Sequence, residues 1–211
     1  MYTPDELHLI NQNLKNKTPL EIVKWAVNLH PGRALVSTHF GPQEAVILHL
    51  CHSVDPQIPV LWADTGHNTR YTYSMAHKFI TQYNLNVKIF VPRTTLGYQD
   101  AYYGGIPSLD QHEAHDQFTK EVKLEPFERG LAELNPKVWL TTLRKDQTEF
   151  RSHLDIVSLS KTGLIKVSPV FHWTQADMEA YLASHNLPNE TRYFDPTKVD
   201  SKRECGLHPG V

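Results

Sequence analysis

Short apolar segments alternate with longer segments of helical periodicity along this chain, and this order restricts its fold more than any other feature. Short apolar segments with the composition of buried strands lie at 33–37, 60–63, 87–91, 138–142 and 165–170. Helical patterns begin at Thr3 and Thr18 and recur at 45–51, 71–83, 123–134 and 173–185. Alternating strands and helices form a parallel sheet that binds ligands at the carboxyl ends of its strands. The sequence therefore predicts an α/β protein with one doubly wound, mainly parallel, Rossmann-like sheet.

We expect a single α/β domain over residues 1–187 and a tail over residues 188–211. The chain has 211 residues, of which 40% are hydrophobic and 21% charged, as is usual for one sizeable core. The stretch 97–117 is rich in Gly, Asp and His and predicts a long irregular excursion or short helices at the border of a pocket. Beyond Leu187 the chain is polar and contains prolines, so we expect a flexible tail.

The charge balance favours a small ligand over a macromolecular one. A net charge of −2 gives no global signal for nucleic acid or membrane binding, so an anion site would need a local cluster of basic residues. The N-terminal residues lack the pattern of a signal peptide, and no stretch approaches the roughly 20 apolar residues of a membrane span. We therefore expect a cytoplasmic protein.

Two loops that follow strands carry candidate ligand-binding residues. The loop from Ser37 to Gly41 joins a strand to a helix, where hydroxyls, free backbone N–H groups and the helix dipole would form an anion cradle. Turns of this kind also occur without a ligand. The next strand ends in 64–66, the tripeptide Asp-Thr-Gly, whose aspartate would either cap the following helix or hold a ribose hydroxyl or a substrate.

Basic residues follow a later strand and add cations to the same edge of the sheet. Arg144 and Lys145 follow the strand at 138–142 after one intervening leucine, and Arg151 lies slightly further on. Arginine pairs with oxyanions in a bidentate geometry, although runs of mixed charge are more often solvated surface. Lys123 and Arg129, taken singly, are equally compatible with a plain surface role.

The chain has two cysteines, and they predict different roles. Cys51 lies among apolar residues of a helix and is expected to be a core thiol. Cys205 follows Lys202 and Arg203 and precedes His208; neighbouring cations lower a thiol pKa and favour the nucleophilic thiolate, while an inert thiol on a frayed chain end is the alternative. Two cysteines are too few for a cysteine-ligated iron–sulfur cluster, and the thirteen histidines form no metal-ligand pattern, so we expect no metal.

Four motifs in this order make the chain similar to the sulfonucleotide reductases, in the branch that reduces phosphoadenylyl sulfate (PAPS). They are 37–43, 64–66, 143–147 and 203–208, and the resemblance runs from about Thr18 to Gly210. The terminal string Glu-Cys-Gly-Leu-His is highly specific, whereas the first two motifs are shared with ATP pyrophosphatases. The resemblance implies the adenine nucleotide alpha-hydrolase-like fold.

The resemblance also implies a thiol-dependent reduction in sulfate assimilation. Cys205 would attack the sulfate sulfur of PAPS, expel adenosine 3′,5′-bisphosphate and become S-sulfonated, after which reduced thioredoxin or glutaredoxin would release sulfite. His208 belongs to the catalytic motif. By position, the substrate-binding residues would be Ser37, Thr38, Phe40, Gly41, Gln43, Asp64, Thr65, Gly66, Lys123, Arg144, Arg151, Lys202 and Arg203.

Departures from the family pattern leave alternatives open. The branch that uses adenylyl sulfate carries paired cysteines where this chain has Phe118 and Thr119, which favours PAPS and no iron–sulfur cluster. Thr38 and His39 replace serine in the first loop, and the segment before Cys205 is short. The alternatives are an ATP-cleaving nucleotidyl transferase or pyrophosphatase, or a non-catalytic nucleotide binder. Homodimers are common in the family, so the resemblance leaves a homodimer open, although no feature of the sequence defines an interface.

Overall fold

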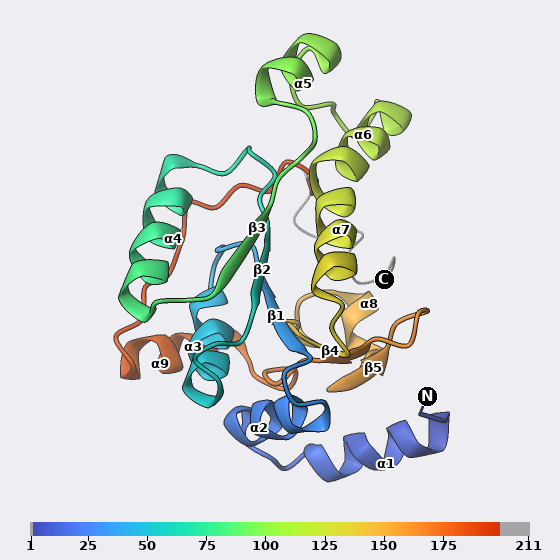
Figure 1. Cartoon of the computed structure of the whole chain (residues 1–211), viewed down its shortest axis with the longest axis vertical. Coiled ribbons are helices and arrows are strands. Elements are labelled where there is room, and N and C mark those ends of the chain that lie inside the picture. Colours follow the sequence, from blue (N-terminus) through green and yellow to red (C-terminus); the bar gives the residue numbers. More distant parts are fainter. Residues whose placement is uncertain (1, 199–211) are drawn as a thin grey trace.

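The computed structural model describes residues 2–198 and shows one six-stranded sheet flanked by helices (Figure 1). The strand order is β3-β2-β1-β4-β6-β5, and each neighbouring pair is parallel except β5 and β6. The strands are β1 (Ala34–Thr38), β2 (Val60–Ala63), β3 (Val87–Phe90), β4 (Val138–Leu140), β5 (Val157–Leu159) and β6 (Ile165–Val167). This confirms the predicted α/β class and mainly parallel sheet.

The helices of the described residues follow the predicted alternation. They are α1 (Pro4–Leu14), α2 (Pro19–Leu29), α3 (Glu44–Val54), α4 (Arg70–Tyr83), α5 (Leu96–Tyr103), α6 (His112–Thr119), α7 (Glu125–Leu134), α8 (Glu149–Ser152) and α9 (Gln175–Ser184). Capping boxes start α1, α2 and α9, where Thr3, Thr18 and Thr174 accept from the backbone three residues on. Thr3 and Thr18 are the residues at which the sequence predicts the first two helices to begin.

The stretch 97–117 lies largely in two short helices, α5 and α6, which is one of the two forms expected for it; α6 continues through a π-helical turn (Lys120–Leu124) into α7. Three strands differ from the sequence expectation. The predicted strands at 138–142 and 165–170 end at Leu140 and Val167, because the residues beyond them turn into loops. Strand β5 was not predicted, since three residues at a sheet edge give too short a pattern.

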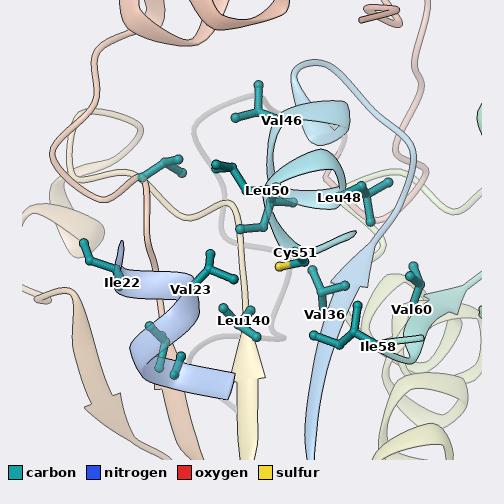
Figure 2. Close-up of a cluster of buried hydrophobic side chains, with 14 of the residues drawn as sticks. Ile22, Val23, Val36, Val46, Leu48, Leu50, Cys51, Ile58, Val60 and Leu140 are labelled. Atoms are coloured by element: carbon teal, nitrogen blue, oxygen red, sulfur yellow. The ribbon is translucent and has the colours of Figure 1, made fainter. Parts of the chain in front are cut away.

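The strands place alternate residues in two cores on opposite faces of the sheet, as the two-residue period of a strand requires. Val36, Val60 and Leu140 belong to the larger core, which also contains residues of α2, α3, α4 and α9. Figure 2 shows these three side chains around Cys51, which is fully buried as predicted. Burial raises the pKa of this thiol, so it stays protonated.

The smaller core lies under α7, on the side of the sheet opposite α3 and α4 (Figure 1). It contains Leu61, Phe90 and Trp139 from three strands. Gly130 of α7 faces these strands so closely that a Cβ atom there would lie 2.8 Å from Leu61 and 2.9 Å from Phe90. The missing side chain therefore sets how near α7 lies to the sheet.

The outer edge of β5 is closed by a side chain of α1. The buried Asn11 amide donates to the carbonyl of Val157 over 3.0 Å, and the Val157 N–H donates to Asn11 Oδ1 over 2.8 Å. Because β5 is the last strand in the sheet, these backbone groups would otherwise lack a strand partner.

Candidate functional site

A polar cleft of about 1000 Å³ lies where β1 and β4 end, the position predicted for a ligand site. Its walls come from the loops after these strands, from α9 and from residues 189–198 of the predicted tail. Of the predicted substrate-binding residues, those that line the cleft are Ser37, Thr38, Gln43, Lys123, Arg144 and Arg151. The structure thus brings together residues that lie up to 114 positions apart in the sequence, from Ser37 to Arg151.

In the loop after β1, several backbone N–H groups donate to nearby side chains. Thr38 Oγ1 accepts from the N–H of Phe40 over 2.9 Å, and Phe40 adopts a positive φ of 52°. The N–H of His39 donates to Glu44 Oε2 over 3.4 Å, and the N–H of Gln43 donates to Asn189 Oδ1 over 2.9 Å. The expectation that this loop presents free N–H groups is therefore wrong for these three residues, since nearby side chains accept from them.

Phe40 and Gly41 do not line the cleft with side chains. The Phe40 ring is 1% exposed and packs edge-on against Trp62, with ring centroids 4.8 Å apart. Gly41 lies against the His39 ring, because a Cβ there would be 2.5 Å from His39 Nε2. Contact of either residue with a nucleotide would be through its backbone.

Asp64, Thr65 and Gly66 form a turn at the end of β2 that is held by hydrogen bonds to the Asp64 and Thr65 side chains. Asp64 Oδ1 accepts from the Gly66 N–H at 3.0 Å and from the Tyr73 hydroxyl at 2.9 Å. Thr65 Oγ1 accepts from the following loop, and its side chain is buried. These contacts give the aspartate a structural role, and the neighbouring Ala63 lines the cleft. A role of the tripeptide in adenosine binding stays a prediction.

The cationic wall of the cleft consists of buried side chains held by polar neighbours. Arg144 is 5% exposed; its Nε donates to Asp146 over 3.0 Å, and its Nη1 donates to the Gln43 side chain. Arg151 is also buried and donates to Gln147, which accepts in turn from the Arg144 N–H. Hydrogen bonds to both guanidinium groups fix their orientation before any ligand binds, which lowers the entropic cost of binding an anion.

Lys123 lies at the end of the π-helical turn and pairs with the predicted tail. Its Nζ is 2.5 Å from Asp195 Oδ2 and 3.3 Å from Thr197 Oγ1; Lys123 and Thr197 are buried, and the Asp195 side chain is 9% exposed. Burial alone would raise the pKa of Asp195, but the Lys123 charge and hydrogen bonds from Thr197 lower it to about 2. Residues 189–198 are therefore part of the cleft wall.

Sequence reasoning missed Glu44, Asn189 and the pairing of Lys123 with Asp195. Glu44 is 4% exposed and contacts the loops after both β1 and β4. An acidic residue in the first turn of a helix is a signal that could have identified Glu44. The other contacts join residues separated by 146 and 72 positions and have no local signature.

Cys205, His208, Lys202 and Arg203 lie outside the described residues. Lys198, the last described residue, lines the cleft, and the sequence reaches Cys205 seven residues later. Within residues 2–198, no group of three or more His, Cys, Asp or Glu side chains could hold a metal ion. Over the same residues, no helix is both long enough and apolar enough to cross a membrane.

The fold and the cleft define a class of parallel α/β proteins with a basic ligand site at the carboxyl edge of the sheet. The family described as phosphoadenosine phosphosulfate reductase domain matches residues 33–195. The chain is 33% identical to the phosphoadenosine 5′-phosphosulfate reductase of Proteus mirabilis, over 94% of this chain and 90% of the relative. It is 35% identical to the enzyme of the same name from Synechocystis, over 96% and 90%. The chain therefore belongs to the phosphoadenosine phosphosulfate reductase family.

Solved structures agree with this assignment. The PAPS reductase from Candida auris, in a phosphate complex, superposes with a TM-score of 0.78 at 25% identity and covers 90% of each chain. The FMN adenylyltransferase of Candida glabrata superposes with a TM-score of 0.60 at 15% identity, over 90% of this chain and 61% of that one. At that identity the likeness shows a shared fold.

Proposed function

We propose that the protein reduces 3′-phosphoadenylyl sulfate to sulfite and adenosine 3′,5′-bisphosphate in sulfate assimilation. The observation that carries this proposal is the cleft wall of buried Lys123, Arg144 and Arg151, in a chain of the PAPS reductase family. The leaving group is a nucleotide phosphate, which needs cationic stabilisation as its charge develops. These three side chains supply such charge from fixed positions.

The nucleophile in this proposal is Cys205. Its thiolate attacks the sulfate sulfur, the bond from sulfur to the bridging phosphate oxygen breaks, and the cysteine carries the sulfonate. A thioredoxin or glutaredoxin dithiol then supplies two electrons, releases sulfite and leaves as a disulfide. Cys51 is unsuited to this role because it is fully buried and its pKa is raised.

Other parts of the proposal rest on the sequence and the family. With two cysteines in the chain, we propose a reaction without an iron–sulfur cluster. The contribution of His208, Lys202 and Arg203 to catalysis or binding, the cytoplasmic location and the homodimer belong to the same proposal. No observation on the described residues favours the ATP-cleaving alternative over the reductase.

The direct test measures sulfite formed from PAPS with reduced thioredoxin. Cys205→Ser should abolish turnover, and intact-mass spectrometry of the native enzyme with PAPS alone should show a sulfonate adduct that this variant lacks. Full turnover by Cys205→Ser would disprove the mechanism. Running adenylyl sulfate in parallel tests the choice of substrate.

A matched pair of variants tests the cationic wall. Arg144→Ala should lower kcat/KM about 100-fold or more, as expected for loss of a charged group aimed at a developing oxyanion. Lys145→Ala removes an adjacent but exposed charge that does not line the cleft, and its kcat/KM should stay within about twofold of the native value. Equal losses in both variants would show that general charge, rather than this wall, supports the reaction.

A further inference from the structure

The cleft contains a buried carboxylate that the proposed reaction does not use. Glu44 is the first residue of α3 and is 4% exposed, yet it lines the cleft. Its Oε1 accepts a hydrogen bond from the Thr142 hydroxyl, and its Oε2 accepts from the His39 N–H over 3.4 Å. A negative group in a site for a polyanion calls for a physical explanation.

Glu44 lies where an external anion would otherwise bind. The N-terminus of an α-helix carries partial positive charge and unpaired N–H groups, and it attracts phosphate groups when a loop leaves it open. Here the first residue of the helix is itself acidic, and the side chains of Thr38 and Asn189 accept from the N–H groups of Phe40 and Gln43 in the loop that precedes it. A phosphate group at this end of α3 would therefore meet a negative side chain and loop N–H groups that already have acceptors.

The surrounding side chains hold this carboxylate in place. His39 Nδ1 lies 3.6 Å from Glu44 Oε1, and the His39 ring packs between Gly41 and Tyr193, 4.7 Å from the Tyr193 ring centroid. Thr142 anchors the same carboxylate from the loop after β4. The carboxylate is thus tied to both loops that frame the cleft.

We propose that Glu44 is a specificity-determining residue that excludes polyphosphate from the loop after β1. Anions bind instead at the wall of Lys123, Arg144 and Arg151, which is built from other segments. A chain of phosphates that extended from this wall to the start of α3 would meet the buried carboxylate. The proposal deepens the proposed function, on which it rests for the identity of the accepted nucleotide.

The test is a comparison of two anions by isothermal titration in the presence of EDTA. The probes are tripolyphosphate and adenosine 3′,5′-bisphosphate, and the variant is Glu44→Gln, which keeps an acceptor for Thr142 and His39. We expect the ratio of tripolyphosphate to bisphosphate affinity to rise at least about tenfold, since juxtaposed like charges strongly disfavour binding. Glu179→Gln is the control, because Glu179 lines the same cleft from α9 but is exposed; its ratio should change less than about twofold.

The outcomes separate this inference from the proposed function. An unchanged ratio in Glu44→Gln, or an equal rise in Glu179→Gln, overturns the role of Glu44. Failure of the native protein to bind adenosine 3′,5′-bisphosphate counts against the proposed function, whereas a gain of tripolyphosphate binding in Glu44→Gln still supports the inference. Glu44→Ala is a second variant in which the same ratio of tripolyphosphate to bisphosphate affinity should rise. If both variants unfold, the native protein decides, since tripolyphosphate binding as tight as that of the bisphosphate overturns the proposal.

Discussion

Lys123 and Asp195 form a buried ion pair between the π-helical turn and residues 189–198. Both side chains are less than one-tenth exposed, so each charge depends on the other to offset its loss of hydration. Thr197 completes the arrangement with hydrogen bonds to both partners. The same lysine is a proposed anion contact, so the pair links substrate binding to the position of this segment.

Asp195→Asn should destabilise the protein by about 3–5 kcal/mol at neutral pH, because it leaves the buried Lys123 charge unpaired. The folded-state pKa of Asp195, about 2, lies below that of an unfolded aspartate. The stabilisation is therefore complete above about pH 4 and is lost as the pH falls toward 2. Urea unfolding at pH 5 and pH 3 should show a smaller loss of stability in the variant than in the native protein.

The control for this measurement is Asp110→Asn, which alters an exposed aspartate. Its free energy of unfolding should differ from the native value by less than about 0.5 kcal/mol at neutral pH. An Asp195→Asn variant with the native pH dependence between pH 5 and pH 3 would contradict the buried pair.

At the level of single residues, the sequence located the cations of the site better than their partners. Arg144 and Arg151 were predicted from their position after a strand, because parallel strands share a carboxyl edge. Glu44 and Asn189 were missed, since their contacts depend on how the loop after β1 turns at Phe40. Phe40 itself is in the core, because its strained backbone directs the ring toward Trp62.

Among the elements, α7 packs against its face of the sheet with no room for a side chain at Gly130. Gly130 allows this approach, as an added methyl group would lie less than 3 Å from Leu61 and Phe90. Both of these residues belong to the smaller core, so a displaced α7 would loosen the core as a whole.

Gly130→Ala should lower the free energy of unfolding by about 1–3 kcal/mol, because overpacking outweighs the helix preference of alanine. Gly97→Ala is the matched control: Gly97 lies in α5, and a methyl group there would have no neighbouring atom within 4 Å, so this change should stabilise the protein by about 0.5–1 kcal/mol. Chemical denaturation measures both values. A Gly130→Ala protein as stable as Gly97→Ala would show that α7 can shift without cost.

The elements that the sequence predicted well are those with strong local signals. Capping threonines and apolar periodicity defined α1, α2 and α9, and short apolar segments defined the central strands. Strand β5 and the π-helical turn were missed because tertiary pairing, rather than local composition, creates them. Pairing with β6 fixes β5, and the turn brings Lys123 to the cleft.

For the whole molecule, the cleft joins three distant parts of the chain. The Gln43 side chain accepts a hydrogen bond from Arg144, and the Gln43 backbone N–H donates to Asn189 Oδ1. Ligand binding at this junction should therefore stabilise the ends of β1 and β4 and the segment 189–198 together.

Hydrogen exchange with and without adenosine 3′,5′-bisphosphate should reveal this coupling. Amides at the ends of β1 and β4 and in 189–198 should exchange more slowly with ligand, because bound ligand opposes local opening. Amides of α1 and β5 should change little, since neither element lines the cleft. Protection confined to one loop would contradict the joint response of the three segments.

The contact of Asn11 with Val157 has a consequence for how copies of this chain interact. An uncovered edge strand is a template onto which a neighbouring polypeptide can add through backbone hydrogen bonds. The Asn11 side chain already pairs with both the N–H and the carbonyl of Val157 that such an addition would use. The first helix thus guards the sheet against self-association. Removal of α1 would expose this edge of the sheet together with the core residues that Leu14 covers, and we expect such a chain to aggregate.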